Sequence, residues 1–101
     1  MGLIREQIVK RFTRSRGWGR VRREFLKESP NCAVCDRDRG REVHHIRDFS
    51  THPELELDVE NLITLCRDHH LLFGHLMSWK SINPDVEVDG IYFRRKIQAR
   101  R

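Results

Sequence analysis

Apolar residues near the N-terminus recur at the three- or four-residue spacing of an amphipathic helix. The first apolar stripe consists of Ile4, Ile8 and Phe12. The second lies over about residues 18–27, with one face formed by Trp18, Val21 and Phe25. Ser29 precedes Pro30, and a residue before proline avoids the helical conformation. The pattern therefore predicts two N-terminal helices, the second of which ends at residue 29.

Shorter apolar runs in the middle of the chain favour strands. Residues 41–46 partly alternate and follow a turn at residues 36–40, and residues 61–65 form a second short run. The intervening residues 47–60 are rich in acidic side chains. We expect this stretch to be a surface loop that is anchored by Leu55, Leu57 and Val59.

Two helices are predicted after the second strand. Residues 67–79 have helical spacing, with one side formed by Leu72, Leu76 and Trp79. Asn83-Pro84 ends this helix, and residues 85–101 add a basic helix around Ile91, Phe93 and Ile97. The resulting order of helix, strand, loop, strand and helix indicates an α+β fold.

The composition indicates that the chain needs more than an apolar core. Hydrophobic residues make up 38% of its 101 residues, and small chains with thin cores are usually stabilised by disulfides or a metal. Three cysteines cannot all pair within one chain, and no apolar signal segment opens the sequence. No apolar run is long enough to cross a membrane. We therefore expect a soluble, cytoplasmic protein with reduced thiols that bind a metal.

Charge is concentrated at the two ends. Residues 1–29 carry a net charge of +6, residues 30–80 a net charge of −3 and residues 81–101 a net charge of +2. Clustered Lys and Arg release counterions from nucleic-acid phosphates and so favour binding to them. An ordinary solvated helix face explains the same pattern, and charge alone does not separate the two interpretations.

The three cysteines have the spacing of a structural zinc site. Cys32 and Cys35 are separated by two residues, which allows both sulfurs to face one ion from a tight turn. Cys66 and His69 are three positions apart and complete a Cys3His set, a standard structural zinc ligand set. The alternative is three unrelated buried thiols. We expect this zinc to be required for folding.

A second group of histidines remains once His69 is assigned to zinc. His70 lies about 100° further around its predicted helix, so it can face a different site. His44 and His45 are neighbours on a predicted strand, so their side chains point to opposite faces and suit separate roles. The assignment of His69 to zinc and His70 to the second site rests on the three-residue spacing and leaves the reverse assignment open.

These motifs together resemble the HNH endonuclease family, and in particular its small zinc-bearing phage members. The matching elements span roughly residues 30–80, and they are Cys32-x2-Cys35, Val43-His44-His45-Ile46, Asn61 and Cys66-x2-His69-His70. The resemblance implies a ββα-metal (His-Me finger) core over residues 30–82. A basic helical arm, residues 1–29, would precede it, and a basic extension, residues 83–101, would follow.

The resemblance also implies roles for individual residues. His45 corresponds to the general base that takes a proton from water, and Asn61 to the residue that orients the loop and the base. His44 and His70 correspond to ligands of one catalytic divalent ion. The family hydrolyses DNA phosphodiester bonds, by nicking or double-strand cleavage, to 5′-phosphate and 3′-hydroxyl ends.

The ligand types qualify this assignment. The family often has Asp where this chain has His44, and an imidazole-rich site favours Mn²⁺, Ni²⁺, Co²⁺ or Zn²⁺ over Mg²⁺. Some relatives have a third ligand one turn beyond the position of His70, so His75 is an alternative ligand of the catalytic ion. It lies about 140° from His70 on a regular helix, and we therefore expect it to pack or support the site instead. His52, beside Pro53, is interpreted as a surface residue.

DNA is the expected partner, with phage packaging proteins implied by the resemblance alone and no membrane. RNA is an open alternative substrate, because phosphate chemistry hardly distinguishes the two sugars. The competing interpretation is a non-catalytic zinc-finger module that binds DNA or a protein. It explains the Cys3His set and the basic ends, but not the additional histidines.

Overall fold

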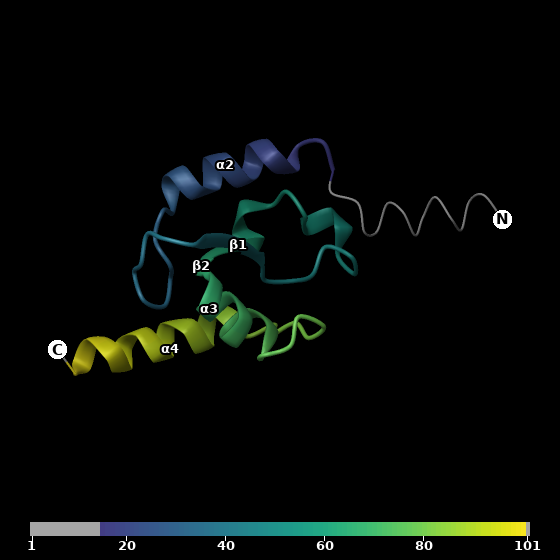
Figure 1. The fold of residues 1–101 in the computed structure, drawn as a ribbon. Helices are drawn as coiled ribbons and strands as arrows, with labels where there is room; N and C mark the ends of the chain where they lie inside the picture. Colours follow the sequence, from purple (N-terminus) through teal and green to yellow (C-terminus); the bar gives the residue numbers. More distant parts are fainter. Residues whose placement is uncertain (1–14, 101) are drawn as a thin grey trace.

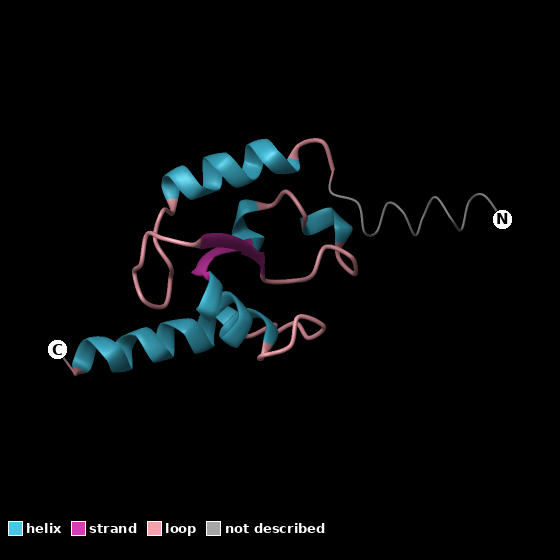
Figure 2. Ribbon diagram, in the orientation of Figure 1, coloured by secondary structure: helices cyan, strands magenta, loops and turns pink. Residues whose placement is uncertain are grey.

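The computed structural model describes residues 15–100. It consists of a two-stranded antiparallel sheet with helices on either side (Figures 1 and 2). The predicted α+β class is confirmed. The N-terminal helix predicted around Ile4, Ile8 and Phe12 lies outside the described residues. None of the helices in the described range is long and apolar enough to cross a membrane.

The two strands agree closely with the sequence pattern. Strand β1 is Arg41–His45 and strand β2 is Leu62–Cys66. They pair antiparallel, with Val43 opposite Thr64. All of β2 is buried, whereas the first two residues of β1 are only partly buried. Gly40, at a φ of 58°, turns the chain into β1, a backbone conformation that glycine adopts without steric cost.

Helix α2, Trp18–Glu28, follows the predicted limits and lies along one side of the sheet (Figure 1). It has no fully buried residue, but the apolar face formed by Trp18, Val21 and Phe25 is partly covered. Helix α4, Val86–Ala99, confirms the C-terminal helix and lies on the other side. Val86 at its start is completely buried.

The helix after β2 is shorter than predicted. Helix α3 covers only Arg67–His69 and continues as a π-helical turn, His70–Gly74. The predicted apolar stripe is not packed, because the side chains of Leu72, Leu76 and Trp79 are 40%, 56% and 46% exposed. The prediction of a regular helix to residue 79 is therefore wrong.

The loop between the strands contains two 3₁₀ turns, Pro53–Leu55 and Val59–Asn61. Two of the three expected anchors, Leu57 and Val59, are 41% and 55% exposed, so the prediction is wrong for them, whereas Leu55 is partly buried. The loop is instead attached through Glu56, which is buried and whose carboxylate accepts a hydrogen bond from the backbone N–H of Ser15 at 3.0 Å.

Candidate metal centres

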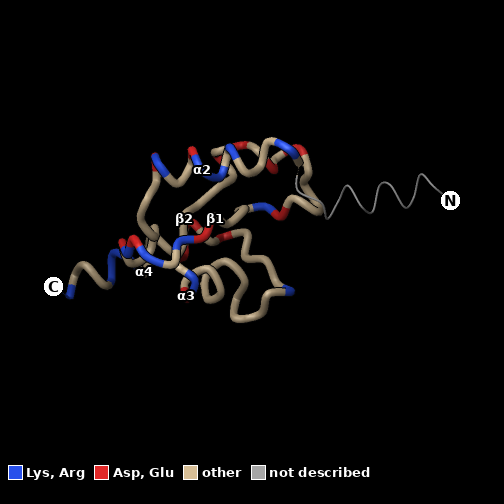
Figure 3. The backbone as a smooth tube through the Cα atoms, turned by 45° about the horizontal axis from the view of Figure 1, so that its top comes forward, with Lys and Arg blue, Asp and Glu red and all other residues tan. Residues whose placement is uncertain are grey.

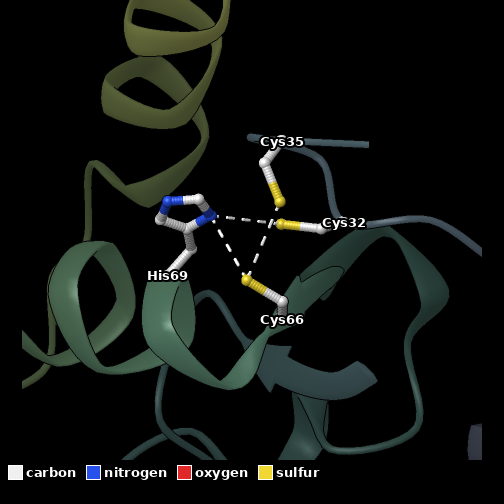
Figure 4. Close-up of side chains that lie close together, drawn as sticks. All are labelled: Cys32, Cys35, Cys66 and His69. Atoms are coloured by element: carbon white, nitrogen blue, oxygen red, sulfur yellow. Dashed lines mark hydrogen bonds between the residues drawn. The ribbon is translucent and has the colours of Figure 1, made fainter. Parts of the chain in front are cut away.

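The three cysteines and His69 converge on one point, which lies between the Cys32–Cys35 turn, the end of β2 and α3 (Figure 4). The Sγ atoms of Cys35 and Cys66 are 3.8 Å apart. The Nδ1 atom of His69 lies 3.3 Å from the Sγ of Cys66 and 3.6 Å from the Sγ of Cys32. A tetrahedral zinc ion with ordinary bond lengths separates two sulfurs by about 3.8 Å and a sulfur from a nitrogen by about 3.6 Å. This Cys3His cluster therefore has the dimensions of a zinc site.

The protonation chemistry of the cluster is also compatible with zinc. Burial lowers the pKa of His69, as does the nearby Arg37, so the imidazole is neutral and can act as a ligand at neutral pH. Burial raises the pKa of the Cys66 thiol to about 11. Burial also acts to raise the pKa of Cys32, but hydrogen bonds from backbone N–H groups outweigh it and lower that pKa. The rings of Phe73 and Phe93 pack against the His69 imidazole at 5.6 and 6.3 Å and fix its orientation.

A second cluster contains His44, His70 and His75. The Nε2 atom of His70 lies 3.0 Å from the Nδ1 of His44 and 3.1 Å from the Nε2 of His75. His44 and His70 were expected to share a site, and the structure places them together. His75 was expected to pack or support the site, but its Nε2 is directed at the same point.

The π-helical turn explains the position of His75. In an α-helix the side chain of residue i+5 points well away from that of residue i. A π turn, with its i to i+5 hydrogen bonding, brings these two side chains closer to the same face. His75 follows the turn His70–Gly74, so its imidazole lies beside that of His70, with ring centroids 4.8 Å apart. Sequence periodicity assumes a regular helix and therefore disfavours His75 as a candidate ligand.

Hydrogen bonding fixes which nitrogen atoms can bind a cation. The Nδ1 of His70 lies 3.1 Å from a carboxylate oxygen of Glu42, and the Nδ1 of His75 lies 2.7 Å from the carbonyl oxygen of Ser81. Both oxygens accept, so each Nδ1 carries the hydrogen and each Nε2 carries a lone pair. Two lone pairs 3.1 Å apart repel each other unless a cation lies between them. The cluster therefore fits a metal ion better than it fits a hydrogen-bonded network.

His44 completes this arrangement. Its Nε2 is buried and has no hydrogen-bond partner among the described residues. Burial, together with the smaller effect of the neighbouring histidines, lowers the pKa of His44 to about 3, so the ring is neutral at physiological pH. If Nε2 carries the hydrogen, Nδ1 becomes the third lone pair of the cluster. His70 is likewise kept neutral by burial, which lowers its pKa against the opposing effect of Glu42.

Glu42 is a functional candidate that the sequence analysis missed. One carboxylate oxygen contacts His70 and the other accepts a hydrogen bond from Arg67 at 3.1 Å. Histidine ligands commonly donate their second N–H to a carboxylate, which fixes the tautomer and the ring orientation. Strand alternation could have identified it, because Glu42 and His44 lie two residues apart on β1 and share a face.

His45 lies at the edge of the same site but has a different environment. Its Nε2 donates a hydrogen bond to the backbone carbonyl of Glu56 at 2.8 Å. Its ring lies 4.6 Å from that of Trp18 and 5.6 Å from that of Phe49. A cavity of about 110 Å³ borders both His45 and the three-histidine cluster. Besides the four histidines, it is lined by Val43, Asp48, Phe49 and Ile82.

Asn61 does not touch the histidines but braces the loop that holds His45. Its side-chain oxygen accepts from the N–H of Arg47 at 2.9 Å. Its side-chain amide donates to the carbonyls of Arg47 and Leu55, at 3.0 and 3.3 Å. Because Leu55 immediately precedes Glu56, these bonds fix the carbonyl that receives the His45 hydrogen bond.

Gly74 is packed so closely against the cluster that a larger residue would displace the histidine rings. A Cβ atom there would lie 3.0 Å from the His44 ring and 3.1 Å from the His70 ring. We predict that Gly74→Ala weakens metal binding by the cluster about 10- to 100-fold, since misplaced ligands cost that much. Isothermal titration with Mn²⁺ would measure the change.

Gly19→Ala is a matched control for this substitution. A Cβ at Gly19 in α2 would have only the flexible end of Arg23 within contact distance, at 3.5 Å. Its metal affinity should equal that of the unmodified protein. Unchanged Mn²⁺ affinity in Gly74→Ala would contradict the assignment of the cluster as a metal site.

Comparison with known families matches residues 32–72 to the model described as HNH endonuclease. No curated protein and no solved structure matches the chain. The matched segment includes the zinc-site cluster together with His44, His45, Asn61 and His70, and it ends before His75. The family resemblance inferred from the motifs is thereby confirmed over this segment.

Proposed function

We propose that this protein, which carries an HNH endonuclease domain at residues 32–72, is a metal-dependent endonuclease that hydrolyses DNA phosphodiester bonds. The observation that carries the proposal is the convergence of three imidazole nitrogens beside a fourth histidine in one cavity. HNH nucleases act on DNA, and the histidines expected to perform that chemistry are the ones that border this cavity.

His45 is suited to act as the general base. Because its Nε2 donates to the Glu56 carbonyl, the lone pair of the neutral ring is on Nδ1, the atom that would take a proton from water. Histidine is the side chain whose unperturbed pKa suits it to act as a base near neutral pH. Asn61 acts as a positioning residue, because it fixes the loop that carries the Glu56 carbonyl.

His44, His70 and His75 would hold a single divalent cation. When bound, that ion supplies Lewis-acid stabilisation of charge on the phosphoryl and leaving oxygens. Three imidazoles favour Mn²⁺, Ni²⁺, Co²⁺ or Zn²⁺ over Mg²⁺. Glu42 keeps the His70 lone pair directed at the ion, because it accepts the hydrogen of the opposite ring nitrogen.

The Cys3His cluster would hold a structural Zn²⁺ that fixes the catalytic geometry. Cys66 is the last residue of β2, and His69 and His70 are consecutive. Zinc ligation of His69 therefore sets the direction in which His70 leaves the helix. The division of the two adjacent histidines between the two ions is part of the proposal, as are the phage packaging partners implied by the family resemblance.

The basic residues along α2 would contact backbone phosphates (Figure 3). We predict that changing Arg20, Arg22 and Arg23 to Ala reduces the slope of log affinity against log salt by up to about 3, since each phosphate contact contributes about 0.9. Fluorescence anisotropy with a labelled duplex over a salt series measures this slope. The charge-matched control changes Arg95, Lys96 and Arg100 in and just after α4. An equal reduction in both variants would indicate a general charge effect and not a binding face.

A plasmid assay tests the proposed function. Supercoiled plasmid is incubated with the zinc-loaded protein and added Mn²⁺ or Ni²⁺, and the nicked and linear products are quantified. We expect cutting by the unmodified protein and by His52→Ala, and none by His70→Ala. His52 is a loop histidine outside both clusters, and it controls for removal of an imidazole. Cutting by His70→Ala at the normal rate would contradict the assignment of the three-histidine cluster as the catalytic metal site. No cutting by the unmodified protein would leave the non-catalytic zinc-module interpretation.

A further inference from the structure

Two large apolar side chains protrude from the turn that follows the three-histidine cluster. Leu76 is 56% exposed and Met77 is 64% exposed. Their backbones have positive φ angles of 52° and 68°, which residues other than glycine rarely adopt. Strained residues of this kind persist only where the surrounding structure imposes them, and they concentrate at functional sites. The turn therefore presents an apolar pair to solvent at a cost in stability.

Hydrogen bonds hold this turn in place. The backbone N–H of Met77 donates to the carbonyl of Leu71 at 2.9 Å, and that of Ser78 donates to the carbonyl of His75 at 3.0 Å. The exposed pair is thus held on a fixed backbone. A side chain that inserts into a binding partner needs a rigid backbone, because a flexible backbone would move away on contact and the side chain would not be inserted.

Trp79 connects the turn to the cluster. Its ring lies 5.2 Å from the His70 ring and 4.8 Å from the His75 ring, and the Arg67 guanidinium lies 5.3 Å above it. Leu76 is covalently next to His75. The turn therefore begins directly after a residue of the cluster, and nucleotides that adjoin a phosphodiester held there would come within reach of it.

We infer that Leu76 and Met77 form a wedge that inserts between base pairs of a DNA duplex next to the bond that is cut. The inference rests on the proposed function, because that function brings DNA to the cluster. Leucine and methionine side chains inserted at a base step unstack it and kink the duplex. Arg67 and Lys80 are exposed cations beside the wedge and are placed to contact phosphates.

The wedge has a consequence for substrate choice. The catalytic cavity is only about 110 Å³, and a kink opens the backbone of a regular duplex toward it. Pyrimidine–purine steps such as TA unstack most easily, so the wedge favours cutting at or beside them. A mismatched duplex is already partly unstacked and needs the wedge less.

The test compares the wedge variant Leu76→Ala/Met77→Ala with Val88→Ala/Ile91→Ala. The control pair is similarly exposed, at 69% and 50%, but lies on α4 away from the cavity. Alanine retains a Cβ atom, so the backbone preference at residues 76 and 77 changes little. Duplexes with 2-aminopurine at TA steps report unstacking by increased fluorescence. Bis(p-nitrophenyl) phosphate, a small diester, reports hydrolysis without any duplex.

We expect the unmodified protein and the control to increase 2-aminopurine fluorescence and the wedge variant not to do so. The wedge variant should cut a matched duplex about tenfold more slowly or worse. It should hydrolyse the small diester at the normal rate, and its cutting of a mismatched duplex should be largely restored.

Normal duplex cutting by the wedge variant, or an increase in 2-aminopurine fluorescence as large as that caused by the unmodified protein, would overturn the inference. Equal losses on the duplex and the small diester would also overturn it, because they indicate damage to the cluster. An unmodified protein that unstacks DNA but cleaves neither substrate would refute the proposed function and leave the wedge standing. One that neither unstacks nor cleaves would refute both.

Discussion

Chelation of the zinc ion is expected to unfold the protein. The buried core of the described residues contains only eight hydrophobic side chains, and two of them, Cys32 and Cys66, are expected zinc ligands. Cys35 packs against the same core. Structural zinc contributes about 10–16 kcal/mol to folding in zinc-finger peptides, whereas whole small domains are stable by about 5–15 kcal/mol. Loss of the ion therefore removes more free energy than the remaining contacts are expected to supply.

Circular dichroism and thermal melting, with and without a zinc chelator, measure this effect. Chelation should abolish the melting transition, and added Zn²⁺ should restore it. The pKa of the Cys66 thiol is raised to about 11, so the thiol is protonated without metal and zinc binding displaces that proton. Zinc affinity therefore falls as the pH falls, and less chelator should unfold the protein at mildly acidic than at mildly basic pH.

Two variants separate the zinc site from the second cluster. Cys66→Ser should fail to fold, because it removes one of four ligands at the centre of the core. His70→Ala should remain folded and retain one zinc ion per chain, because His70 lies in the other cluster. A Cys66→Ser variant with the normal melting temperature would contradict a structural role for zinc.

Ligand spacing carried the most information in the sequence. The Cys32-x2-Cys35 and Cys66-x2-His69 pairs limit the geometry so strongly that the four-residue cluster could be predicted without the fold. The strands could also be located, because β-branched and apolar residues alternate or cluster between turn residues. Helix α2 ended where Pro30 required it to end. Ligand spacing, strand position and the end of a helix depend on residues close together in the sequence, so rules about neighbouring residues predict them.

The errors came from conformations that local rules do not encode. His75 was placed off the site because a regular helix was assumed, and nothing in the residue types of His70–Gly74 identifies a π-helical turn. The close packing of Gly74 against the His44 and His70 rings is a tertiary constraint. Leu57 and Val59 were expected to anchor the loop because they are apolar, but Glu56 holds it through its backbone carbonyl and its carboxylate.

Substitution of His45 by Ala is expected to reduce DNA cutting about 10²- to 10⁴-fold, the usual contribution of a positioned general base. The ring does not belong to either metal cluster, so zinc content and Mn²⁺ affinity should stay normal. The residual activity would come from the bound metal alone. Rates are measured on plasmid under single-turnover conditions, and products are checked for 5′-phosphate ends.

The alanine variant also allows a test by chemical rescue. Removal of the imidazole leaves a space between Trp18 and Phe49, whose rings flank that of His45. Added imidazole can enter this space and accept the proton, so it should restore part of the rate in His45→Ala but not in His70→Ala. A purely structural role for His45 predicts no rescue. In that case the variant is inactive because the hydrogen bond from the His45 side chain to the Glu56 carbonyl is lost, and this tethered bond is absent with or without added imidazole. Cutting by His45→Ala at the normal rate would exclude His45 as the base. The water would then have to be deprotonated by another group that borders the cavity, and Asp48 is the carboxylate that lines it.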